Sequence, residues 1–155
     1  MQHNAFSLQN VSRETFSVLQ KYVALLQQWN QRINLIASST EQDLWQRHIE
    51  DSAQLFLYVE GANVIADIGT GAGFPGIVLA ILGCKTVHLI ESDKRKSIFL
   101  KECVRELLPN NCVTVHDERV ENIPPLCCDV IVSRACAPLD TLLGYAYPHM
   151  KEDAR

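Results

Sequence analysis

The strongest constraint on the fold is the segment 67–76, which reads Asp-Ile-Gly-Thr-Gly-Ala-Gly-Phe-Pro-Gly. A strand-like apolar stretch precedes it over 64–66, and a helix-like apolar stretch follows it over 77–82. Glycines at such a strand-to-helix turn let the backbone turn tightly and approach a ligand with no Cβ in the way. Pro75 suits the first turn of the helix, where its missing N–H costs nothing. The segment therefore predicts a binding site for a nucleotide-like cofactor.

Length and composition indicate one globular domain. The chain has 155 residues, of which 47% are hydrophobic, which is enough for a substantial core. A formal net charge of −4 argues against a general nucleic-acid binder, although it says nothing of a local basic patch. We find no apolar run long enough to span a membrane and no secretion signal, so we expect a cytoplasmic protein.

Six cysteines raise the question of disulfides or a metal site. Their spacing supports neither, because no Cys-x-x-Cys pair occurs, Cys127 and Cys128 are adjacent, and the others are scattered through apolar stretches. We therefore expect buried structural thiols, no metal, and a reducing compartment.

The first part of the chain, 1–60, reads as a helical N-terminal extension. Ser12 can cap a helix whose apolar residues recur at helical spacing, and a loop is predicted over 30–39. Thr40 with Asp43 resembles a cap for a second helix.

The remainder, 61–155, alternates between strand and helix patterns. Strands are predicted over 64–68, 86–90, 112–116 and 129–133, and helices over 75–82, 94–108 and 139–147. This alternation predicts an α/β fold with a mostly parallel, doubly wound sheet. Only four strands are predicted, and the last residues, 151–155, show no pattern typical of a helix or strand. We therefore expect a chain truncated at its C-terminus, with strand 129–133 uncovered at one edge.

Ligands on such sheets bind at the carboxyl ends of the strands. Glu91 ends the second predicted strand, where its carboxylate can accept hydrogen bonds from both ribose hydroxyls; the alternative is a solvated glutamate. The loop 117–121 follows the third strand and can offer backbone groups to an adenine edge, unless it is only a charged surface loop.

Residues 71–76 match the pattern G-x-G-x-x-G, which NAD-type oxidoreductases also use and which can be a purely structural turn. Asp67 separates these readings, because a carboxylate ahead of the glycines would repel a pyrophosphate. It suits the cationic sulfonium and ammonium groups of S-adenosylmethionine, which carries no phosphate. We therefore expect S-adenosylmethionine as the cofactor, with Asp67, Gly71 and Gly73 in its site.

The predicted helix 94–108 carries basic residues opposite apolar ones. A solvated outer face is the simpler interpretation, and phosphate contacts with a nucleic acid are the alternative. Catalytic residues are not predicted, because Ser133-Arg134-Ala135 stands where methyltransferases that attack amines carry Asp/Asn-Pro-Pro-aromatic. A ring nitrogen with a free lone pair needs no general base, so alignment alone could serve as catalysis.

The chain resembles the bacterial 16S ribosomal RNA guanine-N7 methyltransferase family known as RsmG or glucose-inhibited division protein B. The matching residues are Trp29-Asn30 with Asn34-Leu35, Arg47-His48-Ile49 with Asp51-Ser52, the segment 67–76, Phe99-Leu100, Arg119 with Glu121, and Ser133-Arg134-Ala135. One departure is Arg95-Lys96, where the family usually has Lys-Arg.

The resemblance implies a Rossmann-like methyltransferase fold with an N-terminal helical extension. It also implies that Gly69 and Phe74 contact the methyl donor, that Val120 and Glu121 hold its adenine end, and that Arg134 lies by the donor or the target. The implied reaction is methylation of N7 of a guanine in 16S rRNA, with the small ribosomal subunit as partner. We expect a monomer, and a non-catalytic donor- and RNA-binding module remains the alternative.

Overall fold

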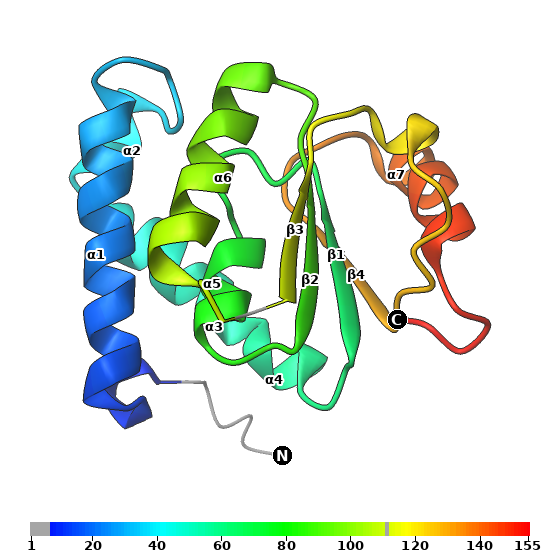
Figure 1. Ribbon diagram of the computed structural model, residues 1–155, viewed down its shortest axis with the longest axis horizontal. Helices are drawn as coiled ribbons and strands as arrows, with labels where there is room; N and C mark the ends of the chain where they lie inside the picture. The colour runs from blue at the N-terminus through cyan, green and yellow to red at the C-terminus, as the bar shows by residue number, and fades with distance from the viewer. Residues whose placement is uncertain (1–6, 111) are drawn as a thin grey trace.

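The computed structural model describes residues 7–110 and 112–155, and within them four parallel strands form one sheet (Figure 1). The strands are β1 (Val64–Ile68), β2 (Thr86–Ile90), β3 (Cys112–His116) and β4 (Val130–Ser133), in the order β3-β2-β1-β4. In register, Ile68 lies beside Ile90 and Ser133, and Ile90 lies beside His116. The predicted parallel sheet is confirmed, and its strand ends meet at one edge.

Helices cover both faces of this sheet. Between the strands lie α5 (Gly76–Ile81) and α6 (Lys94–Leu107), and α7 (Leu139–Ala146) follows β4. Figure 1 shows α5 and α6 on one side of the sheet and α7 on the other, with α1 (Arg13–Asn30) packed outside α6. The short helices of this part are η3 (Val120–Asn122) and η4 (Tyr147–His149).

Side chains of β1 alternate between two hydrophobic cores, as the period of a strand requires. Ile65 belongs to the larger core, which α1, α5 and α6 share. Ala66 and Ile68 belong to the smaller core, which includes Ala146 of α7. Asp67 has the parity of Ile65, so its side chain points toward α5 and away from α7.

The helical extension shares the larger core with the sheet, through Leu19, Tyr22 and Leu26 of α1. Ser12 caps α1 as predicted, since its hydroxyl accepts a hydrogen bond from the Thr15 N–H. The other elements are η1 (Leu8–Asn10), α2 (Ser38–Glu41), η2 (Trp45–Glu50), α3 (Asp51–Gln54) and α4 (Phe56–Val59).

Thr40 was expected to cap the second helix, and this prediction is wrong. Thr40 lies inside α2, and its hydroxyl donates to the Ala37 carbonyl. The following segment, η2, is a π-helix, a rare form that often occurs at functional sites.

The outer edge of β4 is partly covered, contrary to expectation. The Arg155 N–H donates to the Asp129 carbonyl, and the Ile131 N–H donates to the Arg155 carbonyl. The last residues therefore pair with β4 in the pattern of a parallel neighbour.

Candidate functional site

A cavity of about 340 Å³ opens at the carboxyl edge of the sheet. Its lining residues are Ile68, Gly69, Ile90, Glu91, Ser92, Glu118, Arg119, Val120, Glu121, Cys136, Ala137 and Tyr145. This volume is at the lower end of the range for small-molecule sites, roughly 300 to 1,000 Å³. The structure thus brings together four of the predicted site residues: Gly69, Glu91, Val120 and Glu121.

The glycine turn after β1 is pinned to the end of β2. The N–H groups of Gly69 and Thr70 donate to the Ile90 carbonyl, and the Gly71 N–H donates to Glu91 Oε2 at 2.9 Å. Gly69 has φ +68°, and a Cβ there would lie 2.4 Å from Cys136 Sγ. A side chain at position 69 would therefore clash with the opposite wall of the cavity.

Glu91 lies at the centre of this arrangement. Its Oε2 accepts from Gly71 and its Oε1 accepts from the Asp93 N–H at 2.8 Å. Each carboxylate oxygen has capacity for a second hydrogen bond, and the residue lines the cavity. Its carboxylate is thus fixed by two backbone groups and still faces a ligand.

Asp67 is fully buried beneath the glycine turn. Its Oδ2 accepts from Thr70 Oγ1 at 2.6 Å and from the Gly76 N–H at 2.7 Å, while its Oδ1 has no hydrogen-bond partner. Burial raises the pKa of this carboxyl to about 6. Because Asp67 has no exposed surface, it acts in this structure on the turn and the start of α5, and a role in cofactor binding through the turn remains a prediction.

Another part of the cavity wall comes from η3. Val120 is nearly buried and lines the cavity, and its carbonyl lies 3.3 Å from His149 Nε2. Since a carbonyl can only accept, this contact places the ring proton on Nε2. His149 thereby anchors the wall to the C-terminal segment.

Three lining residues, Cys136, Ala137 and Tyr145, were missed by the sequence reasoning. They follow β4, so the rule that ligands bind beyond the strand ends could have pointed to Cys136 and Ala137. Cys127 and Cys136 are exposed, so the prediction of buried thiols is wrong for them, whereas Cys84, Cys103 and Cys128 are buried. The side chain of Cys112 lies outside the described part.

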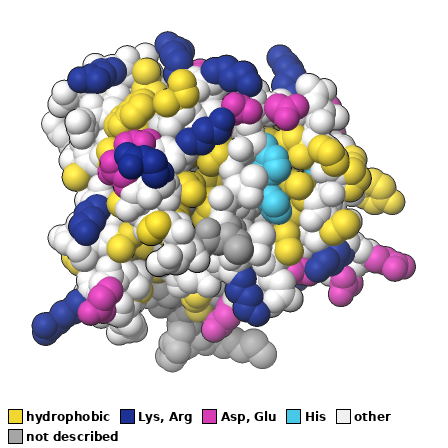
Figure 2. Space-filling model, viewed as in Figure 1, with side chains coloured by type: hydrophobic (Ala, Val, Ile, Leu, Met, Phe, Trp, Pro, Cys, Tyr) yellow, Lys and Arg dark blue, Asp and Glu magenta, His cyan; other side chains and the backbone are white. Residues whose placement is uncertain are grey.

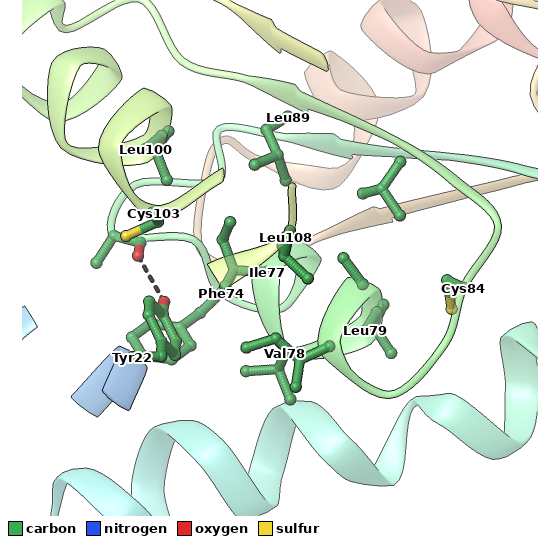
Figure 3. Packing of buried hydrophobic residues seen from close by; sticks show 14 of the residues in the cluster. Tyr22, Phe74, Ile77, Val78, Leu79, Cys84, Leu89, Leu100, Cys103 and Leu108 are labelled. Atoms are coloured by element: carbon green, nitrogen blue, oxygen red, sulfur yellow. Dashed lines mark hydrogen bonds between the residues drawn. The ribbon is translucent and has the colours of Figure 1, made fainter. Parts of the chain in front are cut away.

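Gly73 and Phe74 lie outside the cavity lining, against the helical extension. Tyr22 of α1 donates a buried hydrogen bond of 2.6 Å to the Ala72 carbonyl. Figure 3 shows the Tyr22 ring beside Phe74, and the ring centroids are 5.5 Å apart. Gly73 has no room for a side chain, since a Cβ would lie 2.5 Å from Ile77 and 2.8 Å from the Tyr22 hydroxyl.

Arg134 also lies outside the cavity lining, in a second cluster. Its guanidinium lies 5.1 Å from the Phe74 ring centroid and 2.9 Å, through Nη2, from His48 Nδ1. Asp51 lies 3.6 Å from its Nη1. A surface hollow of about 580 Å³ adjoins this cluster, lined by Thr40, Asp43, Gln46, Arg47, His48 and Asp51.

The basic residues of α6 are largely paired with carboxylates. Lys94 and Lys101 both pair with Asp117, and Arg105 pairs with Glu102 and Glu106. Figure 2 shows the same mixture on this face of the molecule, with acidic side chains interspersed among the basic ones. The simpler interpretation of this face, a solvated and ion-paired surface, is therefore favoured.

The described residues contain no group of three or more His, Cys, Asp or Glu side chains that could hold a metal. None of their helices combines the length and apolar character needed to cross a membrane.

A family model described as rRNA small subunit methyltransferase G (GidB) matches residues 15–155. The chain belongs to this family. It is 51% identical over 143 residues to the ribosomal RNA small subunit methyltransferase G of Paramagnetospirillum magneticum, with 92% of this chain and 69% of the relative covered. The protein of the same name from Rhodospirillum centenum is 53% identical over 137 residues, with 88% and 62% covered. The chain thus spans about two thirds of the length of these relatives.

Solved structures show the same fold at lower identity. An O-methyltransferase from Bacillus cereus in complex with SAH matches with a TM-score of 0.60 and 19% identity, over 93% of this chain and 64% of that one. Pyrococcus horikoshii TYW2 in complex with MeSAdo matches with a TM-score of 0.63 and 16% identity, over 70% and 42%. The predicted Rossmann-like methyltransferase fold is confirmed.

Proposed function

We propose that this chain binds S-adenosylmethionine in the cavity beside Glu91 and transfers its methyl group to N7 of a guanine in 16S rRNA. Membership of the small-subunit rRNA methyltransferase G family carries the RNA substrate and the reaction. The target atom, the small ribosomal subunit as partner, a monomeric state and a cytoplasmic location are the finer parts of the proposal.

The fit of the cofactor rests on the fixed carboxylate of Glu91. A ribose presents two hydroxyl donors, and Glu91 has two oxygens that are held in place by backbone N–H groups and open to the cavity. Glu118 and Glu121 add further acidic side chains to the lining, beside one cation, Arg119. Such a lining disfavours the pyrophosphate of a dinucleotide and suits a cofactor without phosphate.

When bound, S-adenosylmethionine supplies an electrophilic methyl group. In this proposal Glu91 binds the ribose, and Val120 and Glu121 contact the adenine base. Asp67 and Tyr22 hold the glycine turn in its conformation beside the cavity, through hydrogen bonds with Gly76 and Ala72. N7 of guanine carries a free lone pair, so no residue has to remove a proton before attack. Catalysis then rests on positioning, which can supply much of a rate enhancement.

The reaction is tested by labelled-methyl transfer to 30S subunits and to naked 16S RNA. Chain cleavage specific for N7-methylguanosine then maps the modified nucleotide. We expect incorporation at a single guanine. Donor binding without turnover on either substrate would favour the non-catalytic alternative, and methylation at an exocyclic amine would contradict the N7 assignment.

The cofactor is tested separately by calorimetry with S-adenosylhomocysteine. Glu91→Gln should weaken binding by about 1–3 kcal/mol, because charge-assisted hydrogen bonds to the ribose are lost. Glu60→Gln, an exposed carboxylate outside the cavity lining, is the matched control and should bind as the wild type does. Binding of NAD in place of S-adenosylhomocysteine would contradict the proposal.

A further inference from the structure

The segment 47–52 carries a distinctive motif, Arg-His-Ile-Glu-Asp-Ser, to which the cofactor cavity assigns no role. It spans the end of the π-helix η2 and the start of α3. Its position beside Arg134 suggests a function in the second cluster. The inference that follows rests on the proposed function, because it concerns the RNA base that receives the methyl group.

Arg134 is held in one orientation from two sides. Its guanidinium contacts the face of Phe74, which is itself 3% exposed, and the His48 ring stacks on Phe74 at 4.9 Å and 18°. Arg134 Nη2 lies 2.9 Å from His48 Nδ1, and an arginine can only donate. Nδ1 of His48 is therefore the acceptor, and the ring is neutral with its proton on Nε2.

The other ring nitrogen of His48 agrees with this assignment. His48 Nε2 lies 3.2 Å from Thr40 Oγ1, whose own hydrogen is donated to the Ala37 carbonyl. The hydroxyl oxygen thus accepts from the ring. Burial and the nearby Arg134 lower the pKa of His48, which keeps the ring neutral, and Arg47 acts in the same direction while Asp51 opposes it.

Asp51 completes a polar pair with Arg134 at the surface. Its Oδ2 lies 3.6 Å from Arg134 Nη1, and the two side chains are 61% and 35% exposed, so both keep hydrogen-bonding capacity for a ligand. Asp51 also lines the hollow of about 580 Å³. The pair therefore presents donors beside acceptors at the rim of a space that can admit a base.

Arg134 connects the edge of this hollow with the wall of the cofactor cavity. Ser133 ends β4 and donates its hydroxyl hydrogen to the Ile68 carbonyl, and Cys136 forms part of the cavity wall against Gly69. Arg134 lies between Ser133 and Cys136 in the chain and reaches from that wall to η2. We therefore expect a base held by Arg134 to lie near a cofactor in the cavity.

We propose that Arg134 and Asp51 together read the Watson–Crick edge of the acceptor guanine. Arg134 donates to O6, and the two carboxylate oxygens of Asp51 accept from N1–H and the N2 amino group. The pair presents one donor and two acceptors, which is the order that cytosine presents to guanine. Adenine has a donor and an acceptor in the opposite order and is rejected. Reading this edge leaves N7, on the other side of the base, free to accept a methyl group.

The test measures the binding of mononucleotides to protein that is saturated with S-adenosylhomocysteine, with NMR titration as the readout. Inosine 5′-monophosphate differs from guanosine 5′-monophosphate only in lacking the 2-amino group. The wild-type protein should bind the guanosine form about tenfold more tightly than the inosine form, since one hydrogen bond to a charged group is lost. Adenosine 5′-monophosphate should bind more weakly than both.

Two variants separate the two contacts. Asp51→Asn should bind the guanosine and inosine forms about equally, because its amide cannot accept both hydrogen bonds. Arg134→Lys should weaken both forms by the same factor and keep the preference between them, since both carry O6. Glu50→Gln is the matched control, because Glu50 directly precedes Asp51 in the chain but lines a different hollow with Ser7 and Gln54.

A wild-type protein that binds no guanosine 5′-monophosphate, or binds the adenosine form as tightly, would overturn this inference. So would an Asp51→Asn protein that still prefers guanosine over inosine. Failure of the proposed function is recognised separately, because S-adenosylhomocysteine binding and methyl transfer are measured before any mononucleotide is added.

Discussion

Carboxylates stabilise both the glycine turn and helix α6, but they bind different partners in the two regions. Asp67, at the start of the turn, and Glu91, after β2, bind backbone N–H groups of the turn at distances of 2.7 to 2.9 Å, and Asp67 is buried. On α6, Lys101 and Arg105 form ion pairs with carboxylates, and both of these basic side chains are largely exposed to solvent. The carboxylates at the turn fix the backbone around a cavity, whereas the ion pairs of α6 lie on the surface and fix no backbone.

The difference teaches what a charge contributes in each setting. A buried carboxylate that accepts from backbone groups is expensive to disturb, because its donors have no other acceptor. An exposed ion pair contributes little to the free energy of unfolding, because its two charged groups are solvated whether or not they pair. Perturbations of the turn should therefore be large, and comparable perturbations of α6 should be small.

The largest effect is expected for Gly73→Ala. Gly73 has φ +102°, and the added Cβ would meet Ile77 and the Tyr22 hydroxyl below 3 Å. Backbone strain and overpacking should together lower the free energy of unfolding by about 4 kcal/mol in a urea titration. Gly144→Ala in α7 is the control, since nothing lies within 4 Å of its Cβ, and it should not destabilise the protein.

The charge of Asp67 should produce a pH dependence of stability. Its pKa is raised from 3.8 to about 6, so the folded state binds a proton that the unfolded state releases between these values. Its contribution to stability is therefore greatest at low pH and is lost as the pH rises toward and beyond 6. In urea titrations, the free energy of unfolding of the wild type relative to that of Asp67→Asn should increase by about 3 kcal/mol when the pH is lowered from 7 to 3.5. A constant difference between the two proteins would show that this carboxyl is not perturbed.

A smaller effect is expected at the start of α6, where Asp93 binds backbone groups as the residues of the turn do. Its carboxylate accepts from the Arg95 and Lys96 N–H groups and caps the helix. Asp93→Ala should lower Tm by about 3 °C in a thermal melt. Asp93→Asn keeps the cap and should recover most of this loss.

The smallest effect is expected for Lys101→Met. Lys101 pairs with Asp117 at 2.8 Å, but its side chain is 52% exposed and Lys94 also pairs with Asp117. Tm should change by less than about 1 °C, because exposed pairs contribute little. A loss as large as that of Asp93→Ala would break the contrast between the two regions.

Much of the fold could be predicted from the sequence, because short apolar runs and glycines at turns are local signals. The bounds of β1, β2 and β3 agree with the predicted ranges, whereas β4 begins one residue later than predicted, at Val130. Glu91 could be predicted as a site residue from its position at a strand end. Because the carboxyl ends of parallel strands meet at one edge of the sheet, this position places it in the lining of the cavity.

The environment of Asp67 could have been inferred more fully. Alternation along β1 places it on the same side as Ile65, against α5, and that period is readable in the sequence. The neighbours of Arg134 could not be read in this way. His48 and Asp51 lie more than 80 residues earlier in the chain, and only tertiary packing brings them to Arg134.

The hydrogen bond from Tyr22 to Ala72 links two events that a sequence keeps apart. It ties α1 to the glycine turn, so the ordering of the turn and the docking of the first helix share one equilibrium. A ligand that binds only the ordered turn must then stabilise α1 by mass action. Slower amide hydrogen exchange along α1 would report that ligand, although no residue of α1 lines the cavity.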